Sequence, residues 1–170
     1  MSESIATTLG ALGDQSIIPE LRRLLSSSHS KTNVQLHIAI ALGTLGDHSV
    51  IPQLLQELSH PEINLSAGLN IAATLGALNE SSVVPELLRL LSNPKIDPIV
   101  QTGIVKTLGQ LANDEATLEG LATLLQDSVI ADDMYRALWN ISRRVGVRIF
   151  TADDSSTKDF TFVKPGESGR

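Results

Sequence analysis

A motif of the form Leu-Gly-x-Leu-Gly-Asp, with proline five positions further on, recurs along the chain with a few substitutions. Its first glycine falls at Gly10, Gly43, Gly76 and Gly109, and successive copies lie 33 residues apart. A constant period of this length is typical of proteins made of stacked repeats, in which each unit buries its apolar face against its neighbours. The period therefore predicts a repeat array.

Each repeat is predicted to be two helices joined by a polar loop. In the first complete unit, Asp14 or Ser16 can accept hydrogen bonds from the free N–H groups that begin a helix, and Pro19 sits in its first turn, where proline loses no hydrogen bond. After a serine-rich loop, apolar residues recur every three or four positions over residues 32–45, which predicts a second helix. Gly46 is expected to end that helix in a left-handed conformation.

The later units follow the same plan. The first, or outer, helices are predicted over residues 49–58, 82–91 and 115–125, and the second, or inner, helices over residues 64–78, 97–111 and 131–144. Residues 4–12 match only an inner helix, so we expect the array to start with half a repeat and the chain to be an excerpt from a longer protein.

The repeat glycine lies inside a helix, where glycine costs about 1 kcal/mol relative to alanine. We expect this cost to be offset by close approach of an adjacent helix. The last interhelical connection is predicted to be three residues shorter than the others, which places Trp139 at the glycine position.

The predicted fold is all-α, a right-handed α-solenoid of about four helix pairs plus the initial half repeat over residues 1–146. Residues 147–170 form a short non-helical tail. Its two β-prone runs, 147–150 and 160–163, could pair as a hairpin or pack over the last repeat as a cap, and the tail beyond Phe150 could instead be disordered.

Paired helices, the glycine motif and the proline of the next outer helix resemble the HEAT-repeat superfamily, most closely its phycobilisome-lyase-type HEAT-like repeats, over residues 4–144. Residues 137–144, with Gly146, Val147 and Arg148, are similar to the carboxyl end of HEAT arrays attached to cyanobacterial NACHT-type signalling ATPases. The second resemblance implies a sensor or regulatory segment of a larger signalling protein, whose other domains are possible partners. The first leaves open an alternative function, a subunit of a phycobilin lyase or phycobilisome-handling factor.

One departure from that family concerns an arginine that often stands eight positions before the repeat glycine. The corresponding residues here are Gln35, Gly68, Gln101 and Ala131. The ladder of arginine–aspartate bridges seen in many such arrays is therefore expected to be missing, and the motif aspartates are expected to act as helix caps.

Composition excludes several classes of function. The chain has no cysteine, which rules out disulfides, thiolate zinc sites and a cysteine nucleophile. No apolar run approaches the ~20 residues that span a bilayer, and the start lacks a signal peptide, so we expect a cytoplasmic protein without membrane contact. Residues 1–127 carry six basic against thirteen acidic side chains, which argues against nucleic acid as a partner.

The residues that could carry chemistry are scattered. None of the four histidines (His29, His37, His48 and His60) is paired at metal-binding spacing, and the pairs Asp132–Asp133 and Asp153–Asp154 suit a helix start and a polar loop. We therefore expect no catalytic residue, no metal, no cofactor and no enzymatic activity.

The expected function is protein–protein recognition or scaffolding by the inner helices, which usually line the concave side of such arrays. The candidate partner-binding residues face away from the predicted core: Leu36, His37, Ile40, Leu69, Asn70, Ala73, Lys106, Gln110, Arg136, Trp139 and Asn140.

Three alternatives stay open for this surface. The apolar strip could be a groove or could pack against neighbouring helices. Trp139 could anchor a partner or plug the end of the core. Arg143 and Arg144 could hold an acidic partner or suit a helix carboxyl end.

Overall fold

A computed structural model describes residues 8, 13–27, 32–125, 130–151 and 160–163. It comprises two compact units, residues 1–80 and 81–170. Within the described residues of the first unit, the elements are η1 (Gln15–Ile17), α2 (Ile18–Ser26), α3 (Thr32–Thr44), η2 (His48–Val50), α4 (Ile51–Leu58) and α5 (Leu65–Leu78). Those of the second are η3 (Ser81–Val83), α6 (Val84–Leu91), α7 (Pro98–Leu111), α8 (Glu115–Leu125), α9 (Ala131–Val145), β1 (Arg148–Thr151) and β2 (Phe160–Val163).

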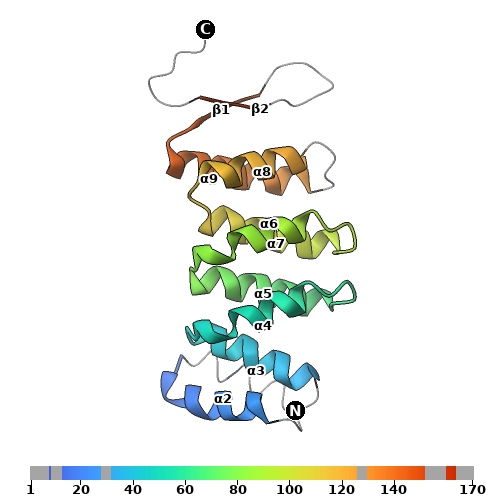
Figure 1. The fold of residues 1–170 in the computed structure, drawn as a ribbon, viewed down its shortest axis with the longest axis vertical. Helices are drawn as coiled ribbons and strands as arrows, with labels where there is room; N and C mark the ends of the chain where they lie inside the picture. The colour runs from blue at the N-terminus through green and yellow to red at the C-terminus, as the bar shows by residue number, and fades with distance from the viewer. Residues whose placement is uncertain (1–7, 9–12, 28–31, 126–129, 152–159, 164–170) are drawn as a thin grey trace. The chain divides into compact units, whose positions relative to one another are not determined.

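Successive helices form pairs, and the pairs pack on one another within each unit (Figure 1). In the first unit α2 packs on α3 and α4 on α5, while α3 also contacts α4 and α5. In the second unit α6 packs on α7 and α8, and α9 packs on α7 and α8. The predicted all-α repeat architecture is therefore confirmed. The expected opening helix at residues 4–12 lies outside the described residues, apart from the helical Thr8.

The outer helices begin as the repeated motif predicts. The carboxylates of Asp14 and Asp47 accept hydrogen bonds from the backbone N–H of Ser16 and Ser49, at 2.9 and 3.0 Å. Each bond caps a short 3₁₀ turn that leads into the α-helix. A proline follows in the first turn of α2, α4 and α6, where its missing N–H costs nothing.

The inner helices end where the sequence predicts. Gly46 has φ +88°, in the left-handed region that favours glycine. Asn79 takes the same role in the next repeat with φ +52°, because asparagine is one of the few residues that tolerate this conformation. Gly146 ends α9 in the same way.

The core is aliphatic, and its residues recur along the helices at spacings of three and four. Leu54 and Leu58 of α4 are fully buried, as are Leu87 and Leu90 of α6. Leu24 of α2 breaks this pattern, since it is 41% exposed. Most outer helices therefore present one apolar stripe inward and a polar face outward.

The repeat glycine permits close approach of the next inner helix, as expected. A Cβ added at Gly43 of α3 would lie 2.4 Å from Cγ2 of Thr74 in α5. One added at Gly109 of α7 would lie 3.3 Å from both Cα and Cβ of Ala137 in α9. The absence of a side chain thus lets α3 approach α5, and α7 approach α9, closely within each unit.

The interpretation that Trp139 replaces this glycine is wrong. Gly43 and Gly109 are buried, whereas Trp139 is 60% exposed. The buried Ser142, 33 residues after Gly109, occupies the position instead. The connection before α9 is therefore not shortened, because Leu138 and Ile141 take the places of the buried Val105 and Leu108 at the unchanged period.

The tail contains a two-stranded antiparallel hairpin. Strand β1 pairs with β2 in a register that matches Arg148 with Val163 and Thr151 with Phe160. The two β-prone runs are thus paired with each other, which is one of the three possibilities that the sequence leaves open. Residues 152–159 and 164–170 lie outside the described residues.

A bridge between repeats also links α2 to the end of α3. Arg22 donates from Nε and Nη2 to the two carboxylate oxygens of Asp47, at 2.6 and 2.8 Å. This guanidinium, with the N–H of Ser49, holds the pKa of the buried Asp47 well below its ordinary value, against the effect of burial. The expectation that Asp47 acts only as a cap is therefore corrected, because the bridging arginine comes from the outer helix.

We predict that Gly43→Ala lowers the free energy of unfolding by about 1–3 kcal/mol through overpacking. Thr74 cannot turn away readily, because its hydroxyl donates to the carbonyl of Asn70 at 2.8 Å and its side chain is buried. Chemical denaturation measures the change. In a Thr74→Ser background, which keeps the hydroxyl and removes Cγ2, Gly43→Ala should cost close to nothing.

The matched control is Gly120→Ala in α8, where an added Cβ lies 3.4 Å from the mobile end of Leu88. It should be neutral or stabilising by up to about 1 kcal/mol, since alanine favours helix. Equal costs at Gly43 and Gly120, or no rescue by Thr74→Ser, would show that the close contact does not require glycine.

We predict that Asp47→Asn lowers the free energy of unfolding near neutral pH by about 1 kcal/mol, because asparagine keeps the cap and loses the charge that Arg22 binds. The folded-state pKa of Asp47 is depressed, so its contribution is present above the ordinary carboxyl pKa of about 4 and is lost as pH falls below it. The two proteins should therefore converge in acid. Asp14→Asn, which alters a cap that has no such bridge to any described residue, should change stability less at neutral pH.

Candidate functional site

The polar side chains that could carry chemistry do not converge. Within the residues that the structure describes, no three His, Asp or Glu side chains are grouped as a metal ion would require. Nδ1 of His37 lies 2.6 Å from the carbonyl oxygen of Asn33, and Nδ1 of His48 lies 3.7 Å from a carboxylate oxygen of Glu80. The helices of the described chain include none that is long and apolar enough to cross a membrane.

Most of the large apolar side chains that are exposed belong to the inner helices. Five large hydrophobic residues are exposed in the described part of the chain, and four of them belong to inner helices. They are Leu65 and Leu69 on α5, Ile99 on α7 and Trp139 on α9, whereas Leu24 lies on the outer helix α2. Because exposed large apolar side chains often mark binding surfaces, the exposed faces of these inner helices are the candidate site.

On α3 the expected exposed strip is absent. Leu36 and Ile40 are both buried, at 9% exposure, so their assignment to an open partner-binding surface is wrong. The physical reason is that α3 carries apolar residues around most of its circumference, and such a helix is buried on more than one side. Consistent with this, α3 contacts α2, α4 and α5. His37, between the two, is partly buried.

On α5 the three candidate residues are all exposed. Leu69 is 37% exposed, and Asn70 and Ala73 lie on the same open face. They sit at i, i+1 and i+4, so one face of the helix presents all three. The first unit therefore offers an apolar patch with one amide beside it.

On α7 and α9 the candidate residues are also exposed, but their chemistry is different. Lys106 and Gln110 lie on the open face of α7, and Arg136, Trp139 and Asn140 on that of α9. The indole of Trp139 is largely in water, which excludes its role as a plug of the core. The second unit therefore presents cations around one aromatic side chain.

Arg144 has a structural task that sequence reasoning missed. Its guanidinium donates to the backbone carbonyls of Gly109 and Gln110 in the last turn of α7. These carbonyls have no partner within their own helix, and a cation there also favours the helix dipole. Arg144 thus caps the neighbouring inner helix rather than its own, and no local sequence signal reveals a partner some 35 positions away. Arg143, next to it, is exposed.

Comparison with known proteins addresses the repeats directly. The family model for HEAT repeats matches residues 3–69 and 51–142, which together cover more than half of the chain. A search of curated protein sequences found no match to the chain.

We predict that Trp139→Ala changes the free energy of unfolding by less than about 0.5 kcal/mol, as expected for an exposed position. Its neighbour Leu138 is 1% exposed and provides the matched control. Leu138→Ala should cost about 2–5 kcal/mol, because it leaves a cavity between packed helices. Thermal or chemical unfolding compares the two, and a large loss for Trp139→Ala would restore the core-plug interpretation.

Proposed function

Because the chain belongs to the HEAT-repeat family, whose helix pairs stack as α-solenoids, we propose that it acts as a protein-recognition module or scaffold. HEAT repeats generally mediate protein–protein interactions, and the family is typically non-catalytic. We propose the same non-catalytic role here, with the exposed faces of the inner helices as the contact surface.

The observation that carries this proposal is the uneven distribution of exposed apolar side chains. Leu69 and Trp139 both lie on inner helices, where the packing of the helices leaves 37% and 60% of their surface exposed. A solvated apolar side chain gains free energy when a partner covers it, and tryptophan is favoured at the centre of interfaces. The outer helices instead carry short-range ion pairs such as Arg89–Glu86.

The finer proposal is that the module serves as a sensor or scaffold segment of a larger cytoplasmic signalling protein. It rests on the resemblance of residues 137–148 to the carboxyl end of repeat arrays in NACHT-type ATPases. Fusion to such an ATPase in the native gene product is the observation that would support it.

We predict that a photo-crosslinking amino acid at Leu69 or Trp139 captures partner proteins in cells that express the chain. The same amino acid at Leu24 is the control, because Leu24 has nearly the exposure of Leu69 but lies on an outer helix. Adducts should form strongly from Leu69 and Trp139 and weakly from Leu24, as gel electrophoresis of the crosslinked chain would show.

Two outcomes would contradict the proposal. If Leu24 gave the same adducts in the same yield, contact would not be directed to the inner helices. If neither Leu69 nor Trp139 formed adducts while the chain remained folded, these faces would not be recognition surfaces under those conditions, and the proposed function would lose its basis.

A further inference from the structure

Helices α7 and α9 pack on each other in the second unit, and a set of their exposed residues is here termed the α7–α9 face. It consists of the exposed residues Lys106, Gln110, Arg136, Trp139 and Arg143, with the exposed Asp132 four positions before Arg136. Lys106 and Trp139 are 33 residues apart, as are Gln110 and Arg143, so each pair occupies one position in successive repeats. Spacings of three and four residues place the members on one side of each helix.

The two helices that carry this face are in close contact. A Cβ added at Gly109 would lie 3.3 Å from Cα of Ala137. Arg144 of α9 also donates hydrogen bonds to the carbonyls of Gly109 and Gln110 in the last turn of α7. Helices packed through glycine lie at the short end of the usual interaxial range of about 8–10 Å. Side chains at equivalent positions of α7 and α9 are therefore within reach of a single bound segment.

The cations of this face differ from those of the outer helices. Three outer-helix arginines are neutralised within the chain, at distances of 2.5–2.6 Å, by the pairs Arg22–Asp47, Arg23–Glu20 and Arg89–Glu86. On the α7–α9 face, Arg136 reaches Asp133 only at 3.5 Å. Lys106 and Arg143 have no ion pair with any residue that the structure describes. Positive charge is thus left available on a chain whose net charge is −6.

Trp139 lies between these cations and supplies an apolar anchor. It is the only tryptophan of the chain and is 60% exposed. On α9 it follows Arg136 by three positions and precedes Arg143 by four, so the indole is flanked by guanidinium groups along the helix. An exposed indole with cations on either side suits a ligand that has an apolar side chain among carboxylates.

We propose that the α7–α9 face binds an acidic peptide segment of a partner protein, with an apolar side chain on Trp139 and carboxylates at Lys106 and Arg143. This rests on the proposed recognition function and specifies the chemistry of its partner. A peptide fits better than a nucleic acid, because tracking a phosphate backbone requires many clustered cations and the chain as a whole is acidic.

The experiment uses the fluorescence of the single tryptophan of the full chain. Two short synthetic peptides share the same leucine residues, and one carries glutamates where the other carries glutamines. The glutamate peptide should shift and quench the Trp139 emission saturably, and this change should weaken as salt is raised. The glutamine peptide should produce little change.

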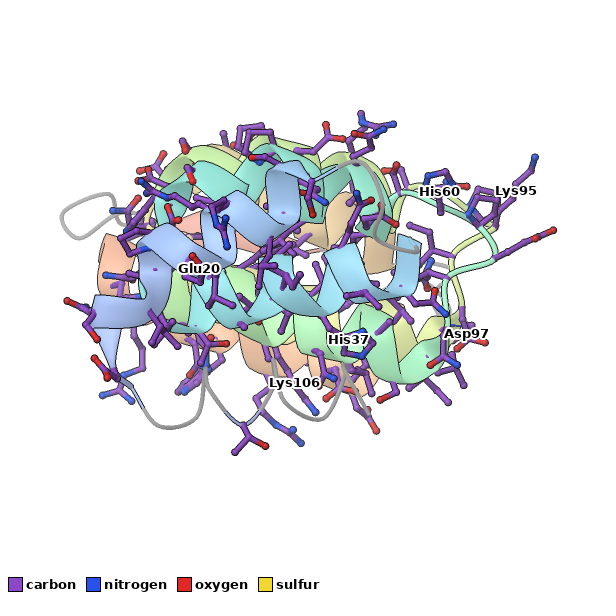
Figure 2. The ribbon with its side chains drawn as sticks, turned by 90° about the horizontal axis from the view of Figure 1, so that it is seen from below. Glu20, His37, His60, Lys95, Asp97 and Lys106 are labelled. Atoms are coloured by element: carbon purple, nitrogen blue, oxygen red, sulfur yellow. The ribbon has the colours of Figure 1, made fainter. Side chains whose placement is uncertain are left out.

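Charge reversal tests the residues involved. Lys106→Glu combined with Arg143→Glu should weaken binding of the glutamate peptide by about tenfold or more. Lys95→Glu is the control, because Lys95 is also an exposed lysine of the same unit and extends from the α6–α7 loop, away from Lys106 (Figure 2). It should change the affinity by less than about twofold. Circular dichroism confirms that each variant is folded.

The possible outcomes distinguish failure of the acidic-peptide proposal from failure of the proposed protein-recognition function. Equal binding of both peptides, or a loss with Lys95→Glu as large as with the double variant, would overturn the acidic specificity and leave protein recognition standing. Tighter binding of a single-stranded oligonucleotide, with quenching of Trp139, would overturn the choice of a protein partner. No response of Trp139 to either peptide, while Leu69 still captures a partner by crosslinking, would overturn the assignment of this face alone.

Discussion

Close packing of successive inner helices is the constraint on which the rest of the structure depends. It requires a residue without a side chain, or with a very small one, once per repeat, as the contacts of Gly43 with Thr74 and of Gly109 with Ala137 show. The helix interior is a costly place for glycine, so its recurrence is explained by the van der Waals contact that it permits. Ser142 marks the same position in the last repeat, where the residue is still small and buried.

The same geometry divides the surface into two kinds. Charged side chains of the outer helices form ion pairs within the chain, such as Arg23–Glu20 and the bridge from Arg22 to Asp47. Inner helices pack on one another within each unit, and three of them, α5, α7 and α9, keep large apolar side chains exposed. The exposed side chains include Leu69 in one unit, and in the other Trp139 with Lys106 and Arg143, which have no ion pair among the described residues. Recognition is therefore proposed where the repeats differ, because the shared residues are committed to packing.

Sequence reasoning succeeded where a signal is local. Caps, first-turn prolines and left-handed helix ends involve residues within a few positions of each other, and the bonds from Ser16 and Ser49 to the motif aspartates follow that expectation. It failed where the answer depends on neighbours in space. Leu36 and Ile40 have the spacing of an outward face, yet they are buried in a helix that contacts three others. The partner of Arg144 could not be predicted either, because it belongs to another repeat.

The sequence by itself determined the repeat length, the helix pairs, their ends and the family, because a fixed period combines with short-range hydrogen bonding and apolar spacing. Only the tertiary structure decided which side chains remain in water. In the structure Trp139 is exposed and does not occupy the buried glycine position, whereas Leu36 and Ile40 are buried and not exposed as expected. The physical reason is that burial is a property of the packed assembly: a periodic pattern defines the faces of a helix, but its neighbours determine which of those faces they cover.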